Sequence, residues 1–294
     1  MAATVYVVAT PIGNLGDLSA RARQVLAQVD VIAAEDTRHT RQLLTHFDIH
    51  TPLISNHQYN EAQRAEDLLE RLRQGQSVAL VTDAGTPCVS DPGYALVAAA
   101  RQAGFEVVTV PGPCAVAAGL SICGLPSGTF AFLGFAPRQD KGIAALADKL
   151  ATLPVQAAVL YESPQRVRRL MAALAERLGE QPCCALNDMT KRHERAYTGT
   201  LAEVAAQLAD NPDAALGEYC IVIALPQRAP EPAAAQLSAE QTLLALCLQE
   251  GLSLREAVAQ AAARGLLPRR AAYQASLRLK TFARQTCGLD EEEA

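Results

Sequence analysis

The residues of this chain that can move a proton stand where short apolar runs end. Glu35 and Asp36 follow the run 31–34, and Asp83 follows the run 77–81. Carboxylates can take a proton from a weak nucleophile or steer it, so Glu35 and Asp36 are candidates for acid–base catalysis. Helix capping is the alternative role for Asp36, because Asp is a preferred N-cap residue. The two roles are compatible.

A second group of ionisable residues lies in the segment 187–194. Lys191 and Glu194 are candidates for the same proton-transfer or steering role, and the sequence does not choose between them and the carboxylates near residue 35. Arg38 and His57 are interpreted as residues on the substrate side. One imidazole without partners does not make a zinc site, so no metal is predicted.

The loops that would position these side chains share one design. An apolar run typical of a buried strand leads into glycine and proline, and then into a helix; the runs are Val5–Ala9, Ser77–Val81 and Val107–Val110. In an open α/β sheet, ligands bind beyond the carboxyl ends of the strands. Gly85 would let a ligand approach the backbone closely. One such loop could equally be an ordinary turn, but three together favour a ligand site.

The glycines do not identify the ligand. Gly13 and Gly16 do not form the Gly-x-Gly-x-x-Gly pattern of dinucleotide folds, and no Gly-Lys-Ser/Thr phosphate loop occurs. Asp91 and Pro92 predict the N-cap and first residue of a helix that ends at Gly104.

Composition bounds the class of protein. Of 294 residues, 50% are hydrophobic and only 4% aromatic, with no Trp, which predicts a large aliphatic core. The net charge of −5 means that any nucleic-acid surface must be a local patch. The eight cysteines form no Cys-x-x-Cys pair and are read as small apolar residues. Without a signal peptide or a long apolar run, we expect a reduced, soluble, cytoplasmic protein that does not enter the membrane.

The order of the predicted elements indicates an α/β protein with a helical appendage. We expect an N-terminal α/β domain over 1–124, a second α/β domain over 125–226, a proline-rich linker over 227–237, and a C-terminal helical module with an acidic tail over 238–294. Paired apolar strands in the second domain favour a homodimer.

The C-terminal module is basic although the chain is acidic. Between Ser238 and Arg284, seven Arg or Lys residues stand against three Glu. The third predicted helix carries most of the candidates for RNA contact, which are Arg269, Arg270, Tyr273, Arg278 and Lys280. A solvated basic helix face is the common alternative, but a charge opposite to that of the whole chain favours RNA docking.

Six motifs together resemble one known family. They are Thr10-Pro-Ile-Gly-Asn-Leu, Ala34-Glu-Asp-Thr-Arg38, Asp83-Ala-Gly-Thr-Pro with Asp91-Pro-Gly93, Pro111-Gly-Pro-Cys114 and Tyr161-Glu-Ser-Pro164. This set resembles the tetrapyrrole-methylase-like superfamily of S-adenosylmethionine-dependent (class III) methyltransferases. Within it, the chain is similar to the ribosomal RNA small subunit methyltransferase I family, over about its whole length.

The resemblance implies a function, a cofactor and a binding site. The expected reaction is 2′-O-methylation of the ribose of a decoding-centre cytidine in 16S ribosomal RNA, free or in the small ribosomal subunit, with S-adenosylmethionine as cofactor. The positions matching the family's cofactor contacts are Pro11, Gly13, Asp83, Ala84, Gly85, Thr86, Cys114, Ala115, Tyr161 and Glu162. The chain departs from the family pattern at Tyr59, Gln165 and Asn187-Asp188, and the last departure removes an arginine.

Two other functions are compatible with these residues. A small-molecule methyltransferase of the tetrapyrrole type would leave the basic C-terminal helices unexplained. A non-catalytic RNA-binding protein on a methylase fold is favoured by the altered Asn187-Asp188 pair. Calorimetry with S-adenosylmethionine and with bare small-subunit RNA would separate the three.

Overall fold

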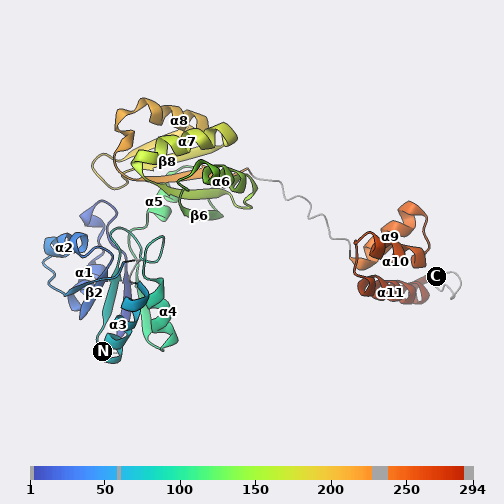
Figure 1. Cartoon of the computed structure of the whole chain (residues 1–294), viewed down its shortest axis with the longest axis horizontal. Coiled ribbons are helices and arrows are strands. Elements are labelled where there is room, and N and C mark those ends of the chain that lie inside the picture. Colours follow the sequence, from blue (N-terminus) through green and yellow to red (C-terminus); the bar gives the residue numbers. More distant parts are fainter. Residues whose placement is uncertain (1–2, 58–60, 227–237, 288–294) are drawn as a thin grey trace. The chain divides into compact units, whose positions relative to one another are not determined.

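The chain divides into two compact units, Met1–Gln227 and Arg228–Ala294. A computed structural model describes residues 3–57, 61–226 and 238–287 (Figure 1). Each unit has its own hydrophobic core, and the first contains two β-sheets.

The first sheet is parallel and covered by helices on both faces. Its order is β3-β2-β4-β1-β5, formed by β1 (Thr4–Val8), β2 (Val31–Ala34), β3 (Leu53–Ser55), β4 (Val78–Val81) and β5 (Glu106–Val110). Residues of α1 (Ala20–Gln28) and α2 (Thr37–His46) pack in one core cluster, and those of α3 (Glu61–Arg73) and α4 (Tyr94–Gln102) in another. Because both faces are buried, β2 and β4 are apolar at every position, as their sequences predicted.

The second sheet is mostly antiparallel. Its order is β6-β7-β10-β8-β9, formed by β6 (Phe130–Phe135), β7 (Ala157–Glu162), β8 (Pro182–Asn187), β9 (Arg195–Thr200) and β10 (Tyr219–Ala224); only β6 and β7 pair in parallel. One core cluster joins it to α6 (Asp140–Thr152), α7 (Pro164–Leu178) and α8 (Leu201–Asp210).

Helix α5 (Ala115–Ile122) connects the two sheets and packs on the second. A Cβ on Gly119 would lie 3.0 Å from the Cys220 sulfur and 3.2 Å from Leu186, so the missing side chain lets the helix lie close to the sheet. Helix α5 thus packs against the second sheet, and the domain boundary at residue 124 stays a prediction. The doubly wound sheet beside a mixed one confirms the predicted fold class.

The second unit contains three helices in its described part, α9 (Ala239–Glu250), α10 (Leu254–Ala263) and α11 (Arg269–Cys287). Capping boxes begin the first two, Ser238 with Gln241 and Ser253 with Glu256. Leu243, Ala257 and Ala272 are fully buried between the helices. Asn60 and Gln63 also match the capping-box pattern in sequence, but Asn60, like Tyr59, lies outside the described residues.

Most of the described cysteines are buried or partly buried, in agreement with their interpretation as small apolar residues. Four cysteines are buried, at positions 123, 183, 184 and 220, while Cys88 is exposed. Across the described ranges, every helix is too short or too polar to cross a lipid bilayer.

Candidate active site

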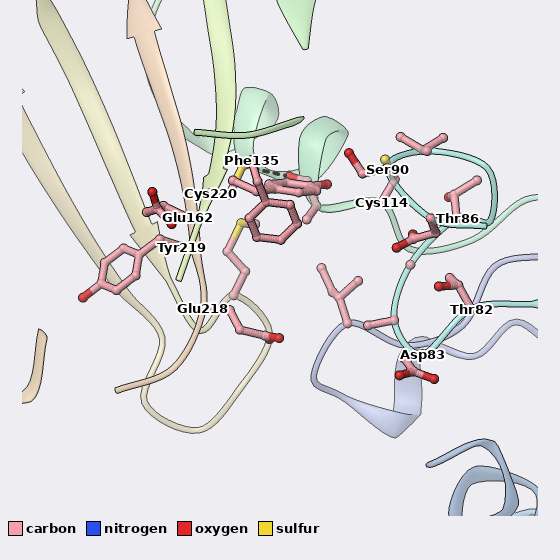
Figure 2. Close-up of a pocket in the computed structure, with 18 of the residues that line it drawn as sticks. Thr82, Asp83, Thr86, Ser90, Cys114, Phe135, Glu162, Glu218, Tyr219 and Cys220 are labelled. Atoms are coloured by element: carbon pink, nitrogen blue, oxygen red, sulfur yellow. Dashed lines mark hydrogen bonds between the residues drawn. The ribbon is translucent and has the colours of Figure 1, made fainter. Parts of the chain in front are cut away.

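A cavity of about 530 Å³ opens where the strand-end loops of the first sheet face β6, β7 and β10 of the second. In Figure 2, Thr82, Asp83, Thr86, Ser90 and Cys114 lie on one side, and Phe135, Glu162, Glu218, Tyr219 and Cys220 lie on the other. Its volume falls within the range of small-ligand sites, about 300–1,000 Å³. The structure therefore brings together segments as far apart in the sequence as Ile12 and Cys220.

Most of the predicted cofactor residues line this cavity. They are Asp83, Ala84, Gly85, Thr86, Cys114, Ala115, Tyr161 and Glu162. Pro11 and Gly13 are not among the described residues that line it. A Cβ on Gly13 would lie 2.5 Å from Lys191 Cγ and 3.0 Å from the Met189 carbonyl oxygen, so Gly13 instead lets the first loop pack against the segment 189–191.

Gly85 has the special backbone that the sequence suggested. Its φ of +90° lies in the left-handed region, which residues with a side chain rarely adopt. Two backbone hydrogen bonds hold it to Thr10: Thr10 N donates to Gly85 O at 2.9 Å, and Gly85 N donates to Thr10 O at 3.1 Å. The Thr86 hydroxyl donates to the Pro113 carbonyl oxygen at 3.1 Å. All three strand-end loops are thereby linked beside the cavity.

Asp91 does not cap a helix, which corrects the sequence prediction. Helix α4 begins at Tyr94, after Gly93, and the cap comes from Glu61 at the start of α3. The Glu61 carboxylate accepts hydrogen bonds from the backbone N–H of Gly93 at 2.7 Å and of Ala95 at 3.0 Å. Gly93, with φ +132°, turns the chain before the helix, and Asp91 is left to line the cavity.

The environment of Asp91 changes its acidity. Burial, followed by the negative charge of Glu35, raises the pKa of Asp91 to about 7. Burial also raises the pKa of Asp83, with Glu35 adding to the effect. A carboxyl group with a pKa near neutrality changes its charge under working conditions, and such groups cluster at functional sites. The motif Asp91-Pro-Gly93 after a strand could have identified Asp91 as a site residue, but the same motif also predicts a helix start.

Glu35 also lines the cavity, whereas Asp36 is not among the described residues that line it. The Thr82 hydroxyl donates to the Glu35 carboxylate at 2.7 Å, which fixes that side chain. Asp36 is the N-cap of α2 and pairs with Arg38 at 2.7 Å. Hydrogen bonds from Arg38 hold the pKa of Asp36 well below its usual range, so Asp36 is a weak proton acceptor. Of these two predicted carboxylates, Glu35 is therefore better placed than Asp36, and Asp91 adds a carboxyl group that the sequence analysis did not propose for catalysis.

Lys191 lies beside the cavity and holds one of its lining residues. Its amine donates to Asp188 at 2.7 Å and to Glu218 at 3.0 Å, and Glu218 lines the cavity. Burial lowers the pKa of Lys191, but the hydrogen bonds to the two carboxylates outweigh this effect, so its pKa lies above the ordinary value. A charged amine cannot accept a proton, so Lys191 is suited to positioning and not to general-base catalysis.

Glu194 and Asn187 organise the same region. The Glu194 carboxylate accepts from the Thr190 backbone N–H at 2.6 Å, where Thr190 has a φ of +67°. The Asn187 amide donates to the carbonyl oxygens of Leu216 at 3.1 Å and Glu218 at 3.4 Å. At this position, where the chain departs from the arginine of the family pattern, Asn187 thus has a structural role that supports the Glu218 loop.

The predicted RNA contacts lie in both units. The Arg38 side chain is 86% exposed, and His57 is half-buried. Arg269, Arg270, Tyr273 and Lys280 are exposed on α11. Arg278 is also exposed, but it forms an ion pair with Glu240 at 2.5 Å, so part of its charge is already compensated.

The site fits S-adenosylmethionine in three respects. The left-handed Gly85 and the small residues Ala84 and Ala115 leave backbone groups accessible. Ile12 and Met189 give the cavity an apolar part. Third, the carboxyl groups of Glu35, Asp83 and Asp91 can supply negative charge for a cationic ligand. Across the described residues, no group of His, Cys, Asp and Glu forms a metal site.

This fold and this cavity define a class of methyltransferase. The chain matches the family of tetrapyrrole (corrin/porphyrin) methylases over residues 4–205. Two solved structures have a similar fold: uroporphyrin-III-C-methyltransferase from Thermus thermophilus, with a TM-score of 0.53 and 22% identity over 75% of this chain and 94% of that one, and a diphthine synthase, with a TM-score of 0.59 and 13% identity over 76% and 90%.

Curated sequences narrow the class to one branch. A ribosomal RNA small subunit methyltransferase I from Xylella fastidiosa (strain Temecula1) is 44% identical over 276 residues, covering 92% of this chain and 97% of that protein. One from Escherichia coli O157:H7 is 40% identical over 259 residues, covering 88% and 89%. The chain therefore belongs to the ribosomal RNA small subunit methyltransferase I family. This confirms the expected family and the expectation of S-adenosylmethionine as methyl donor.

Proposed function

We propose that this protein transfers a methyl group from S-adenosylmethionine to the ribose 2′-hydroxyl of a decoding-centre cytidine in 16S ribosomal RNA. Family membership supports the methyl transfer and the class of RNA. The observation that carries the chemistry is Asp91, a cavity-lining carboxyl group whose pKa is raised to about 7.

The reaction replaces the proton of a 2′-hydroxyl by a methyl group, so one proton must be accepted. When bound, S-adenosylmethionine supplies an activated methyl group, and the protein needs to orient the reactants and exclude water, which can contribute about 7–11 kcal/mol. Asp91, once ionised, can accept the proton, and its pKa near neutrality suits a general base. Glu35, fixed by Thr82, is the second candidate.

The remaining predicted roles fit this division of work. Residues around Gly85, Cys114 and Tyr161 would hold the methyl donor. Lys191 would orient Glu218 at the rim of the cavity, and Arg38, His57 and α11 would contact RNA. Such a substrate is found in the cytoplasm, and a homodimer stays an expectation that light scattering on the purified protein would test.

Mapping 2′-O-methylation on ribosomal RNA from cells that lack this protein tests the proposed function. One ribose methylation on a decoding-centre cytidine should disappear, and the intact gene should restore it, whereas a gene encoding Asp91→Asn should not. If the pattern of ribose methylation is unchanged, the proposed substrate is wrong. Calorimetry with S-adenosylmethionine and with bare small-subunit RNA then distinguishes the two alternatives. A tetrapyrrole-type enzyme would bind only S-adenosylmethionine, and a non-catalytic RNA-binding protein on a methylase fold would bind only RNA.

A further inference from the structure

We propose that Phe135, at the mouth of the cavity, is a platform on which a nucleobase of the RNA substrate stacks. The inference rests on the proposed function and adds a substrate-binding subsite to it. Phe135 is the last residue of β6, lines the cavity and is 59% exposed (Figure 2). Isolated exposed apolar residues are common, so exposure alone would not carry this inference.

An irregularity in β6 aims Phe135 at the cavity. In a regular strand, side chains three positions apart point to opposite faces. Phe132 and Phe135 nevertheless both contact the Tyr161 ring, with centroid distances of 4.8 and 5.6 Å. The pairing of β6 with β7 shifts between Phe132 and Phe135, and Gly134 has a φ of +68°. Such bulges often re-aim a side chain beside an active site.

The same bulge lies against the loop that carries Asp91. A Cβ on Gly134 would lie 3.3 Å from the Ser90 hydroxyl oxygen, and Ser90 itself has a φ of +70°. Ser90 is therefore a non-glycine residue in the left-handed region, and strained positions of this kind cluster at functional sites. Phe135 and Asp91 are therefore held by touching segments and line one cavity.

This arrangement suits a nucleotide. Aromatic side chains bind unpaired bases by stacking on their faces, and this is a main way in which single-stranded RNA is recognised. Tyr161 meets the Phe135 ring at an interplanar angle of 68°, so it supports Phe135 without stacking on it in parallel. A base at the mouth would leave its ribose to extend toward the carboxylates deeper in the cavity. The adenine of the methyl donor is the competing occupant.

The first test compares three variants in single-turnover methyl transfer to small ribosomal subunits from cells lacking the protein. Phe135→Ala should lower the rate at subsaturating subunits by about 5- to 150-fold, the range expected for loss of one base–aromatic stack. Phe135→Trp should restore it. Phe130→Ala is the matched control, because Phe130 is 48% exposed at the other end of the same strand. A wild-type rate for Phe135→Ala, or an equal loss for Phe130→Ala, would overturn the proposal.

The second test reads stacking directly. The chain has no Trp, so Phe135→Trp introduces a single fluorescent reporter. A single-stranded RNA fragment with the target cytidine should quench its emission in the presence of S-adenosylhomocysteine, and Phe130→Trp should not respond. Quenching by S-adenosylhomocysteine alone, with a matching affinity loss in Phe135→Ala, would assign the ring to adenine and overturn the proposal.

Two controls separate this inference from its foundation. If the wild-type protein methylates no subunits, the proposed function fails, while the fluorescence test still decides whether Phe135 contacts RNA. Light scattering on Phe135→Ala shows whether the protein changes its oligomeric state. If that variant loses a dimer together with its activity, Phe135 is an interface residue and the proposal is wrong.

Discussion

Asp91 shows how one residue can combine recognition with chemistry. Its carboxyl lies in a cavity with Glu35 and Asp83, so each negative charge makes the next less favourable. A cation in the cavity would relieve this repulsion and favour the ionised form. S-adenosylmethionine carries a positive sulfonium, whereas its product S-adenosylhomocysteine does not, and the acidic side chains would therefore distinguish donor from product.

We expect the affinity for S-adenosylmethionine to rise with pH through about 7, the value to which the pKa of Asp91 is raised. Below it Asp91 is neutral, and above it the carboxylate attracts the sulfonium. If binding lowers the pKa of Asp91 by about one unit, the dissociation constant should fall about fivefold between about pH 6 and about pH 8, and about tenfold over the whole titration. Calorimetry measures it.

S-adenosylhomocysteine is the internal control for this pH effect, because it has the same amino and carboxyl groups without the sulfonium. Its affinity should change less over the same pH range. Asp91→Asn should make the two ligands respond alike. If the ligands already behave alike in the wild-type protein, Asp91 does not face the sulfonium.

Gly85 contributes through its backbone conformation. Gly85→Val should abolish binding of S-adenosylmethionine, because a β-branched residue opposes a φ of +90° and would displace the loop that joins Thr10. Gly75→Val is the matched control: Gly75 has a φ of +84° and open space around its missing side chain, outside the cavity lining. Both variants should lose about 1–2 kcal/mol of stability for the left-handed conformation. Wild-type ligand affinity in Gly85→Val would contradict the assignment of this loop to the cofactor.

The next scale is that of loops and helices. The segment 188–194 after β8 is fixed by contacts of its own acidic and basic side chains, with left-handed residues at Asp188 and Thr190. Lys191 is its central residue, because the amine ties Glu218 to this segment while the carbon stem lies against Gly13. Loops from both sheets are joined through one side chain.

Lys191→Ala should therefore lower methyl transfer by at least about tenfold, a loss of roughly 1.4 kcal/mol in transition-state stabilisation, with little change in affinity for S-adenosylhomocysteine. The Glu218 side chain is 73% exposed, which places the lost contact at the solvent-facing rim of the cavity. Single-turnover kinetics with calorimetry decide the matter. An equal loss of ligand affinity would move Lys191 into the cofactor site.

Helix α11 tests whether a basic face is a docking surface. Arg269 and Arg270 are exposed, whereas Arg278 is paired with Glu240. Replacing Arg269 and Arg270 by Ala should flatten the plot of log affinity against log salt by about 1.4 to 1.8 units if both contact phosphate, at roughly 0.7 to 0.9 for each contact. Arg255→Ala on α10 serves as control, because Arg255 is exposed too. An unchanged slope would show that α11 is only a solvated surface.

At the scale of the whole molecule, the sequence predicted individual helices, strands and loops better than the tertiary contacts between distant segments. Strand-end motifs located most of the cavity lining, because loops after parallel strands converge on one edge of a sheet. Phe135 and Glu218 were missed, since their positions depend on a bulge and on the packing of the second sheet against these loops. Asp91 was misread because its local sequence favours a cap that Glu61 supplies from another helix. A local sequence pattern does not show that a residue from another helix supplies the cap.

The division into two units predicts a division of function. The described cavity lining lies entirely within Met1–Gln227, and the predicted basic docking residues of α11 lie within Arg228–Ala294. Deleting residues 233–294 should therefore leave the affinity for S-adenosylmethionine intact while weakening RNA binding. The deleted part contributes contacts and not chemistry, so the loss should appear in KM more than in kcat.

Salt provides an independent way to produce the same defect. Phosphate contacts release counterions, so raising the salt concentration should weaken RNA binding by the full-length protein toward the level of the truncated one. The truncated protein should respond less, because fewer of its contacts are with phosphate. We would measure binding of decoding-region RNA to both proteins at several salt concentrations, with calorimetry of S-adenosylmethionine as the check on folding. If truncation leaves the salt slope unchanged, the RNA contacts must be sought in the first unit, around Arg38, His57 and Lys191, whose exposed or half-buried side chains lie near the strand-end loops.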